Sequence, residues 1–397
     1  MSSFLPPNDP WPLWGVMIAS VGLCVWLEQA RSWGGKIGGP LLALVAGMAL
    51  SNLKIMPVDC ASYDVVDSYL VPLAIPLLLF RANVVKIVRE TGQMFLGFHV
   101  AAVGTMLGGF LAAFLFNGSF ARVPEVTGIM SASYIGGGVN FVAVSKSYDV
   151  SPELTNPLLV ADNFIMAGMF AVLFMFAEAK FFRRRYAHPH SVDVAAGASE
   201  SLAAKHWKRK EIALLDIAKA FAVAFVIAAV SIKATGWIKA STDSKIIHSI
   251  FGNAFILITV LTVALTTLWH REMENIHGSD ELGMYLLYVF FLVIGLRADL
   301  VQVILNVPVL FGFCLVMAAT NLVFTLVVGK LFKLNLEELL LSVNATLGGA
   351  PSAAAMAIAK GWSNLVLPGL LAGIWGYVIG TFLGVVMTEA LKAAGGF

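Results

Sequence analysis

The sequence predicts an all-helical membrane protein of two inverted repeats, each with about five transmembrane helices and one glycine-rich re-entrant or broken helix. Three observations lead to this prediction: an apolar composition, twelve hydrophobic segments, and matches in one order between the two halves. Of the 397 residues, 59% are hydrophobic and 13% are charged, whereas a soluble domain has about 45–50% and about 25%. This composition excludes a soluble enzyme, a coiled coil, collagen and a disordered chain.

Charge and cysteine content exclude further classes. The net charge of +2, with no basic stripe interleaved with aromatic residues, gives no basis for nucleic-acid binding. Three scattered cysteines form neither a disulfide framework nor a metal cluster. No Lys or Arg precedes the first apolar segment, so it lacks the positive region of a cleavable signal and is expected to be a membrane helix.

Twelve segments are candidates to cross a bilayer, which takes about 20 apolar residues in a helix. They are residues 12–30, 38–53, 65–80, 92–117, 124–145, 154–178, 212–235, 247–269, 282–296, 308–332, 337–359 and 364–391. One clearly aqueous stretch with Lys and Arg at both ends, residues 180–211, separates the sixth segment from the seventh. The predicted organisation is an N-terminal membrane repeat (1–179), a basic linker (180–211) and a C-terminal inverted membrane repeat (212–397).

The two halves match at several places in the same order. The matched pairs are the five residues from Arg81 with the five from Arg297, Glu125 with Glu337, Gly136 with Gly348, Pro157 with Pro368, and Ala161 with Ala372. Their offsets are 216, 212 and 211 positions. One such match means little in a sequence rich in Gly and Ala, but this ordered series indicates an internal duplication.

The fifth and eleventh segments have a glycine cluster at their centres. Glycine inside a helix costs about 1 kcal/mol relative to Ala, and Pro351 in the second cluster removes a backbone donor. An interrupted backbone must be buried in protein or line a wet cavity, because lipid cannot satisfy its polar groups. Close packing through small residues is the alternative, but the equivalent position in both halves favours an interruption.

Lys and Arg placement bears on which segments cross the membrane. With Lys219 set aside, these residues divide 14 to 11 between the two sides if all twelve segments cross, and 17 to 8 if the two glycine-rich segments are re-entrant. Cytoplasmic loops are the Lys/Arg-rich ones, which favours the second arrangement. Five crossings per repeat then invert the second half, place both termini outside and put the basic linker in the cytoplasm.

Asp162 is the acidic residue that lies near the middle of a hydrophobic segment, followed by Asn163. A carboxylate at that depth is costly and is by default a functional candidate, either as a sodium ligand or as a proton carrier. The alternative is a buried Asp paired with a neighbouring Ser, Asn or amide. Three other residues are weaker candidates: His99 more often packs than shuttles protons, and Lys146 and Lys360 either meet an anionic substrate or snorkel to the interface.

Two inverted repeats with interrupted helices near the midplane are the architecture of many secondary transporters. Interrupted helix ends present N–H groups that attract anions and carbonyl groups that bind cations. The sequence has no nucleotide-binding Gly-x-x-x-x-Gly-Lys-Ser/Thr motif, which argues against a primary pump. It has no Ser/His/Asp or metal-ligand pattern either, so we expect neither an enzyme nor a cofactor beyond Na+ or H+ as coupling ion.

The glycine-rich segments Gly136–Asn140 and Gly348–Ser352 resemble those of sodium/glutamate symporters and 2-hydroxycarboxylate transporters. Over its full length the chain resembles the integral-membrane family called "domain of unknown function 819", grouped with the bile-acid sodium symporters in the cation:proton antiporter and anion transporter superfamily. The resemblance implies a mobile core of segments four to six and ten to twelve, a scaffold that often dimerises, and an elevator movement. The second half departs from the first at Ala350-Pro351-Ser352, which leaves the ligands there open.

Carried onto this chain, the resemblance implies a cation site and a substrate site. The cation site would contain Asp162, Asn163, Asn140 and Ser352, with a possible Na+ at Asp162. The substrate site would contain Ser133, Gly136, Gly137, Gly138, Asn344, Thr346, Gly348, Gly349 and Gly373. Gly373 and Gly376, at the position that corresponds to Asp162, are expected to mark a second unwinding.

The predicted function is Na+- or H+-coupled symport of a small carboxylate, amino acid or short peptide by a homodimer in the bacterial cytoplasmic (inner) membrane. Carboxylates are favoured because helix N-termini bind anions. A Na+/H+ antiporter is the alternative, since Asp162 followed by Asn163 suits that role. The second half, however, has no deep Lys, Arg or acid to complete a charge-balanced ion site. A non-transporting membrane scaffold is a further alternative, but a scaffold needs no midplane Asp.

Overall fold

The computed structural model describes residues 3–31, 39–192, 211–241, 251–297 and 300–396, and the regular structure in these residues is helical. The first half contains α1 (Pro10–Ala30), α3 (Gly39–Asn52), α4 (Ala61–Val65), η1 (Val66–Leu70), α5 (Val71–Leu79), α6 (Val84–Glu90), α7 (Gln93–Leu115), α8 (Val123–Ser147), α9 (Pro152–Glu178), α10 (Lys180–Arg183) and η2 (Pro189–Val192). The second contains α12 (Leu214–Ser241), α14 (Ala254–Leu268), α15 (His270–Glu274), α16 (Ser279–Leu296), α17 (Leu300–Leu331), α18 (Leu336–Ala359), η3 (Ser363–Leu365) and α19 (Val366–Ala394).

Eight helical stretches within the described residues are long and apolar enough to cross a membrane, and the continuous stretch α4–η1–α5 counts as one of them. Two shorter apolar helices, α3 and α14, accompany them. Two other long helices, α8 and α18, are not among these eight, and they are the two glycine-rich segments. The all-helical prediction is confirmed for the described residues, where each of the twelve predicted segments contains a helix.

Some boundaries differ from the prediction. The helix α17 begins at Leu300, eight residues before the predicted start, and Pro308 lies inside it; membrane helices tolerate such a proline because neighbouring groups satisfy the freed backbone. The helix α12 continues to Ser241 instead of ending at 235. Most of the predicted aqueous linker, residues 193–210, and residues 298–299 of the predicted match after Arg297 lie outside the described residues.

Two ion pairs show that the α4–η1–α5 stretch and α16 run antiparallel to each other. The Arg81 guanidinium, just after α5, lies 3.2 Å from the Asp280 carboxylate at the start of α16. The Arg297 guanidinium, just after α16, lies 3.0 Å from the Asp64 carboxylate in α4. The two arginines are 216 positions apart and so are the two aspartates. An ion pair therefore joins the end of the α4–η1–α5 stretch to the start of α16, and a second one joins the end of α16 to the start of that stretch.

The helix α8 folds back on itself at Gly137, where φ is 71° and ψ is −170°. The Arg122 guanidinium before α8 donates hydrogen bonds to the carbonyl groups of Tyr148 and Asp149 after it, at 2.7 and 2.9 Å. A straight helix of 25 residues would separate those ends by about 37 Å. We call α8 hairpin 1; its two arms meet at a glycine because that φ strains other residues.

The helix α18 has the same interruption at Gly349, with φ 73° and ψ −172°. Residues from both of its ends, Glu337 before the interruption and Lys360 after it, line one cavity, so α18 also folds back and is called hairpin 2. Both glycine-rich segments thus fold back as hairpins, which fits the re-entrant alternative better than that of broken helices that continue across.

The two hairpins open toward opposite ends of α9 and α19. At the open end of hairpin 1, the Tyr148 hydroxyl donates to Glu389 near the end of α19 at 2.8 Å. At the open end of hairpin 2, the Lys360 ammonium lies 3.0 Å from Glu178 at the end of α9. Because α9 starts beside the open end of hairpin 1, it runs from the open end of hairpin 1 to the open end of hairpin 2.

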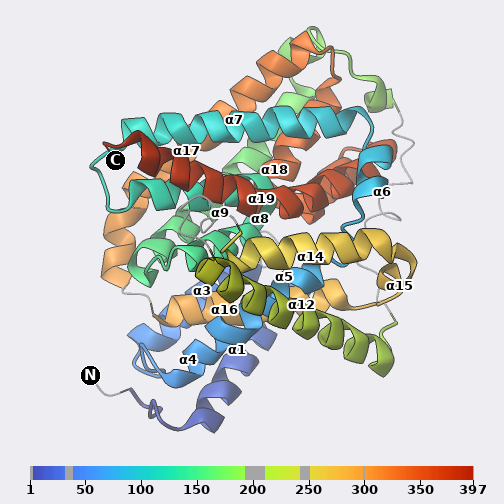
Figure 1. The fold of residues 1–397 in the computed structure, drawn as a ribbon. Helices are drawn as coiled ribbons and strands as arrows, with labels where there is room; N and C mark the ends of the chain where they lie inside the picture. Colours follow the sequence, from blue (N-terminus) through green and yellow to red (C-terminus); the bar gives the residue numbers. More distant parts are fainter. Residues whose placement is uncertain (1–2, 32–38, 193–210, 242–250, 298–299, 397) are drawn as a thin grey trace.

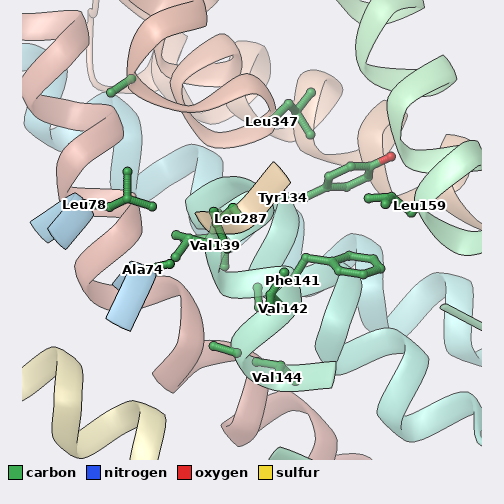
Figure 2. Close-up of a cluster of buried hydrophobic side chains, with 14 of the residues drawn as sticks. Ala74, Leu78, Tyr134, Val139, Phe141, Val142, Val144, Leu159, Leu287 and Leu347 are labelled. Atoms are coloured by element: carbon green, nitrogen blue, oxygen red, sulfur yellow. The ribbon is translucent and has the colours of Figure 1, made fainter. Parts of the chain in front are cut away.

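The hairpins pack with α7, α9, α17 and α19 in one group of helices, which lies above a second group that includes α1, α5, α12 and α16 (Figure 1). Buried apolar side chains fill the boundary between the groups. Figure 2 shows Val139 and Val142 of hairpin 1 in one cluster with Ala74 and Leu78 of α5 and Leu287 of α16. The second arm of hairpin 1 therefore lies on an apolar surface.

Candidate functional site

The tips of both hairpins meet at the side chain of Tyr377, near the middle of α19. A methyl group added to Gly137 would lie 3.6 Å from Tyr377 Cε1, and one added to Gly349 would lie 3.2 Å from its hydroxyl oxygen. Both tips therefore lie close to the same ring. Sequence reasoning missed this residue, although a tyrosine one helical turn after Gly373 in a segment rich in Gly is a signal that points to it.

The backbone of α19 packs closely against both hairpins beside their tips. A methyl group on Gly136 would collide with the Gly376 carbonyl, one on Gly376 with the Ile135 carbonyl, and one on Gly373 with the backbone of Ala350. The helix α19 runs unbroken from Val366 to Ala394. The predicted second unwinding at Gly373 and Gly376 is therefore wrong, because these glycines allow close packing against the hairpins.

This contact predicts that Gly136→Ala destabilises the protein. The new methyl group also meets the Asn140 amide, and we expect the overpacking to lower the free energy of unfolding by about 1–3 kcal/mol. Thermal unfolding in detergent measures the change. Gly168→Ala in α9 is the matched control, since a methyl group there meets nothing within 4 Å. Equal melting temperatures for the two variants would contradict the packing.

Asp162 is bonded to hairpin 1 one helical turn before its tip. The Ser133 hydroxyl donates to Asp162 Oδ2 at 2.8 Å, and Asp162 is only 7% exposed. Figure 2 shows the neighbouring Tyr134 ring directed toward Leu159, one turn before Asp162 in α9. No ion pair among the described residues involves Asp162. The Tyr134 hydroxyl also lies close to the carboxylate, but neutral hydroxyl groups do not neutralise a buried carboxylate, so the group suits a cation or a proton.

The other predicted cation-site residues have different partners. Asn140 donates to the carbonyl groups of Gly136 and Gly376 at 2.8 and 3.3 Å, and accepts from the Thr381 hydroxyl at 2.6 Å. Asn163 donates to a carbonyl of its own helix, and Ser352 donates to Asn344 at 2.5 Å. Within the described part of the chain, the hydrogen bonds bring Ser133, not these three residues, to Asp162.

Hairpin 2 is held together across its interruption by Asn344. Its amide oxygen accepts from the Ser352 hydroxyl, and its nitrogen lies 3.4 Å from the Ser352 carbonyl and 3.2 Å from Met356 Sδ. A methyl group on Gly348 would meet the side chains of both Asn344 and Ser352. Two predicted substrate residues, Asn344 and Gly348, thus lie together with the predicted cation-site residue Ser352 at the tip of hairpin 2.

A buried polar chain joins the two hairpins. The Thr105 hydroxyl donates to the Tyr134 carbonyl at 3.0 Å, and the Asn321 amide donates to the hydroxyls of Thr105 and Thr346 at 2.7 and 3.1 Å. Thr105 and Asn321 are 216 positions apart, and Tyr134 and Thr346 are 212 apart. Thr346 was a predicted site residue, whereas Thr105 and Asn321 were missed; their matched offset in two apolar segments is the signal that identifies them.

The weaker candidates all have partners. Lys146 lies 2.8 Å from Asp67 and Lys360 lies 3.0 Å from Glu178. His99 contacts the Phe95 carbonyl through Nδ1 and accepts from Trp375 through Nε2. Each of these side chains connects its own segment to a distant one.

Comparison with known proteins gives matches along nearly the whole chain. The family described as "Protein of unknown function (DUF819)" matches residues 15–394. The chain belongs to the DUF819 family. It is 42% identical over 388 residues to the uncharacterized membrane protein YjcL of Bacillus subtilis (strain 168), with 98% of each chain covered.

The DUF819 match spans both hairpins, α9 and α19, so the whole candidate site lies inside the family region. Together with the eight apolar helices and the printed description of YjcL as a membrane protein, it identifies a multi-pass integral membrane protein.

Proposed function

We propose that this DUF819 protein is a cation-coupled secondary transporter of a small organic solute, with the solute bound between the hairpin tips at Tyr377. One observation carries the proposal: two interrupted hairpins open toward opposite ends of α9 and α19, and both tips lie close to one side chain. Interrupted helices that meet near the midplane are where secondary transporters bind substrate and ion.

The reciprocal contacts support the proposal that the halves are inverted repeats. Arg81 with Asp280 mirrors Arg297 with Asp64, and Thr105 contacts Asn321, its own counterpart. A contact between equivalent residues is expected where a two-fold axis passes between them. The hairpin group is then the mobile core and the second group the scaffold of an elevator. The superfamily placement, the homodimer, the cytoplasmic membrane and an inward-facing basic linker belong to the same proposal.

The chemistry of the tips favours a solute with a carboxylate. The second arm of each hairpin begins directly after Gly137 or Gly349, so its first N–H groups face the tip and attract an anion. The first arms end there with their carbonyl groups toward the tip, and the carbonyl end of a helix attracts a cation, although the Gly136 carbonyl also accepts from Asn140. Asp162 adds the buried negative charge that a Na+ or H+ needs. Substrate and coupling ion would therefore bind on either side of the hairpin 1 tip.

The binding part of this proposal is tested by the thermal stability of the purified protein in Na+ against K+ at several pH values. The screen includes a panel of organic acids, amino acids and dipeptides, because a ligand of the native state alone raises stability in proportion to its saturation. We expect Na+- or pH-dependent stabilisation that one solute amplifies. A pH-sensitive Na+ effect with no responsive solute would favour a Na+/H+ antiporter, and no response to ion or solute would contradict both.

A further inference from the structure

The cavity at the open end of hairpin 2 has a volume of about 170 Å³. Its charged and aromatic lining consists of Glu178, Arg183, His188, Glu337, Lys360 and Trp362. The volume exceeds the share of about 30 Å³ that one water takes in the liquid and is below the 300–1,000 Å³ that is typical of pockets for drug-sized molecules. The cavity therefore has room for a small organic molecule.

Glu337 faces this cavity without a partner. It is 2% exposed, and neither of its carboxylate oxygens has a hydrogen-bond partner among the described residues. The backbone amides of Glu337 and His190 lie near the carboxylate but make no hydrogen bond of ordinary geometry with it. Because a buried carboxylate without a donor is costly, this group is suited to a ligand that brings its own donors.

The equivalent residue of hairpin 1 shows what is missing. Glu125, 212 positions earlier and also in the first turn of its hairpin, lies 3.4 Å from the Arg122 guanidinium and 3.2 Å from the Lys392 ammonium. By the same offsets, Leu334 and Phe181 stand where Arg122 and Lys392 would be. In the described part of the chain, hairpin 2 has the carboxylate without an Arg or Lys partner. The imidazoles of His188 and His190 lie close enough to act on it electrostatically, but neither forms a hydrogen bond with it, so an ammonium group complements it.

The positive groups in the cavity argue against a bare cation. Lys360 and Arg183 lie 3.0 and 3.4 Å from Glu178, so these two cations share one carboxylate, whose side chain is 64% exposed. A ligand with only positive charge would be repelled by them. The described residues also offer no group of three or more His, Cys, Asp or Glu placed to hold a metal ion.

We propose that this cavity binds a small zwitterion of the α-amino acid class, with its ammonium group on Glu337 and its carboxylate at Lys360 and Arg183. The ligand would join the first arm of hairpin 2 to the end of α9 and to the start of the linker. The linker already contacts this hairpin, because the Leu336 amide donates a hydrogen bond to the Ala187 carbonyl at 2.8 Å. Bound ligand stabilises this arrangement. The inference is independent of transport at the hairpin tips.

The test is isothermal titration calorimetry on the full-length protein in detergent. Glycine, L-alanine and L-serine are compared with propionate and ethylamine, which are alanine without its amino group and without its carboxylate, and with NaCl alone. We expect binding of at least one amino acid and not of the single-charge analogues. In Glu337→Gln the Kd of that amino acid should rise at least about tenfold, since a buried charge loses its partner. Glu125→Gln, the matched control, should leave it unchanged.

Two further variants separate this site from the hairpin tips. Lys360→Met should lower the preference for the amino acid over ethylamine, and Asp162→Asn should leave the Kd as in the wild type. Binding of ethylamine or NaCl as tight as that of the amino acid, no amino-acid binding, or an unchanged Kd in Glu337→Gln would overturn the proposal. Loss of binding in Asp162→Asn but not in Glu337→Gln would place the amino acid at the tips, so that the transport proposal stands and this one fails.

Discussion

Replacement of Asp162 by Asn is expected to abolish the cation dependence of both solute binding and uptake while the protein stays folded. Asn keeps the shape of the side chain, and its amide oxygen can still accept the Ser133 hydrogen bond. What it removes is the one buried negative charge beside hairpin 1. Loss of a buried charge partner costs a bound cation about 3 kcal/mol or more, which is about 100-fold in affinity.

The measurement is the Na+ and pH dependence of the melting temperature, followed by the apparent Na+ affinity. Ser133→Ala is the matched comparison, since it removes a single hydrogen bond and retains the charge; we expect a loss of about tenfold. Asn163→Ala, which loses only a bond to its own helix, should have a smaller effect. Sodium dependence retained in Asp162→Asn would show that the coupling ion binds elsewhere.

Replacement of Tyr377 by Ala is expected to remove solute binding and to lower stability. The partly buried ring lies beside both hairpin tips, so its loss leaves a gap there, and we expect a cost below the about 3–5 kcal/mol that is typical of a fully buried aromatic. Without the ring, the two helix N-termini at the tips no longer hold a fixed spacing. Thermal unfolding and the Kd of the responsive solute measure the two effects.

Tyr377→Phe separates the two roles of this side chain. It retains the ring and should keep most of the stability, while the loss of the hydroxyl beside Gly349 should weaken solute binding by about tenfold. Na+-dependent stabilisation should persist in both variants, because Asp162 is untouched. A Tyr377→Ala protein that binds the solute as tightly as the wild type would exclude the tips as the solute site.

The helices could be predicted because a run of apolar residues indicates a segment that lies in lipid or in the protein interior, wherever it occurs in the chain. The interruptions at Gly137 and Gly349 could also be predicted, since clustered glycines weaken a helix at a defined place. The direction of the chain after each interruption could not. It depends on one pair of backbone angles, and the contacts that reveal the fold-back, such as those of Arg122 with Tyr148 and Asp149, join positions that no local pattern connects.

Several single residues of the candidate site could be predicted from the sequence, but the contacts between them could not. Asp162 is buried near a hairpin tip. Its hydrogen bond from Ser133 fits the interpretation of Asp162 as an ion or proton site and also the alternative of a buried Asp paired with Ser. Asn140 bonds hairpin 1 to α19 through Thr381, which depends on packing between distant segments. Tyr377 was missed for the same reason, because a tyrosine in an apolar helix shows its role only when both tips are seen to lie close to it.

Coupled transport itself is measured by gradient-driven uptake into proteoliposomes. The purified protein is reconstituted, an inward Na+ or proton gradient is imposed, and uptake of the solute that stabilises the protein is followed over time. We expect accumulation above the outside concentration, its collapse when the gradient is dissipated, and no accumulation with Asp162→Asn. Equal uptake with and without either gradient, or no uptake of a solute that binds, would contradict the assignment of this family member as a coupled transporter.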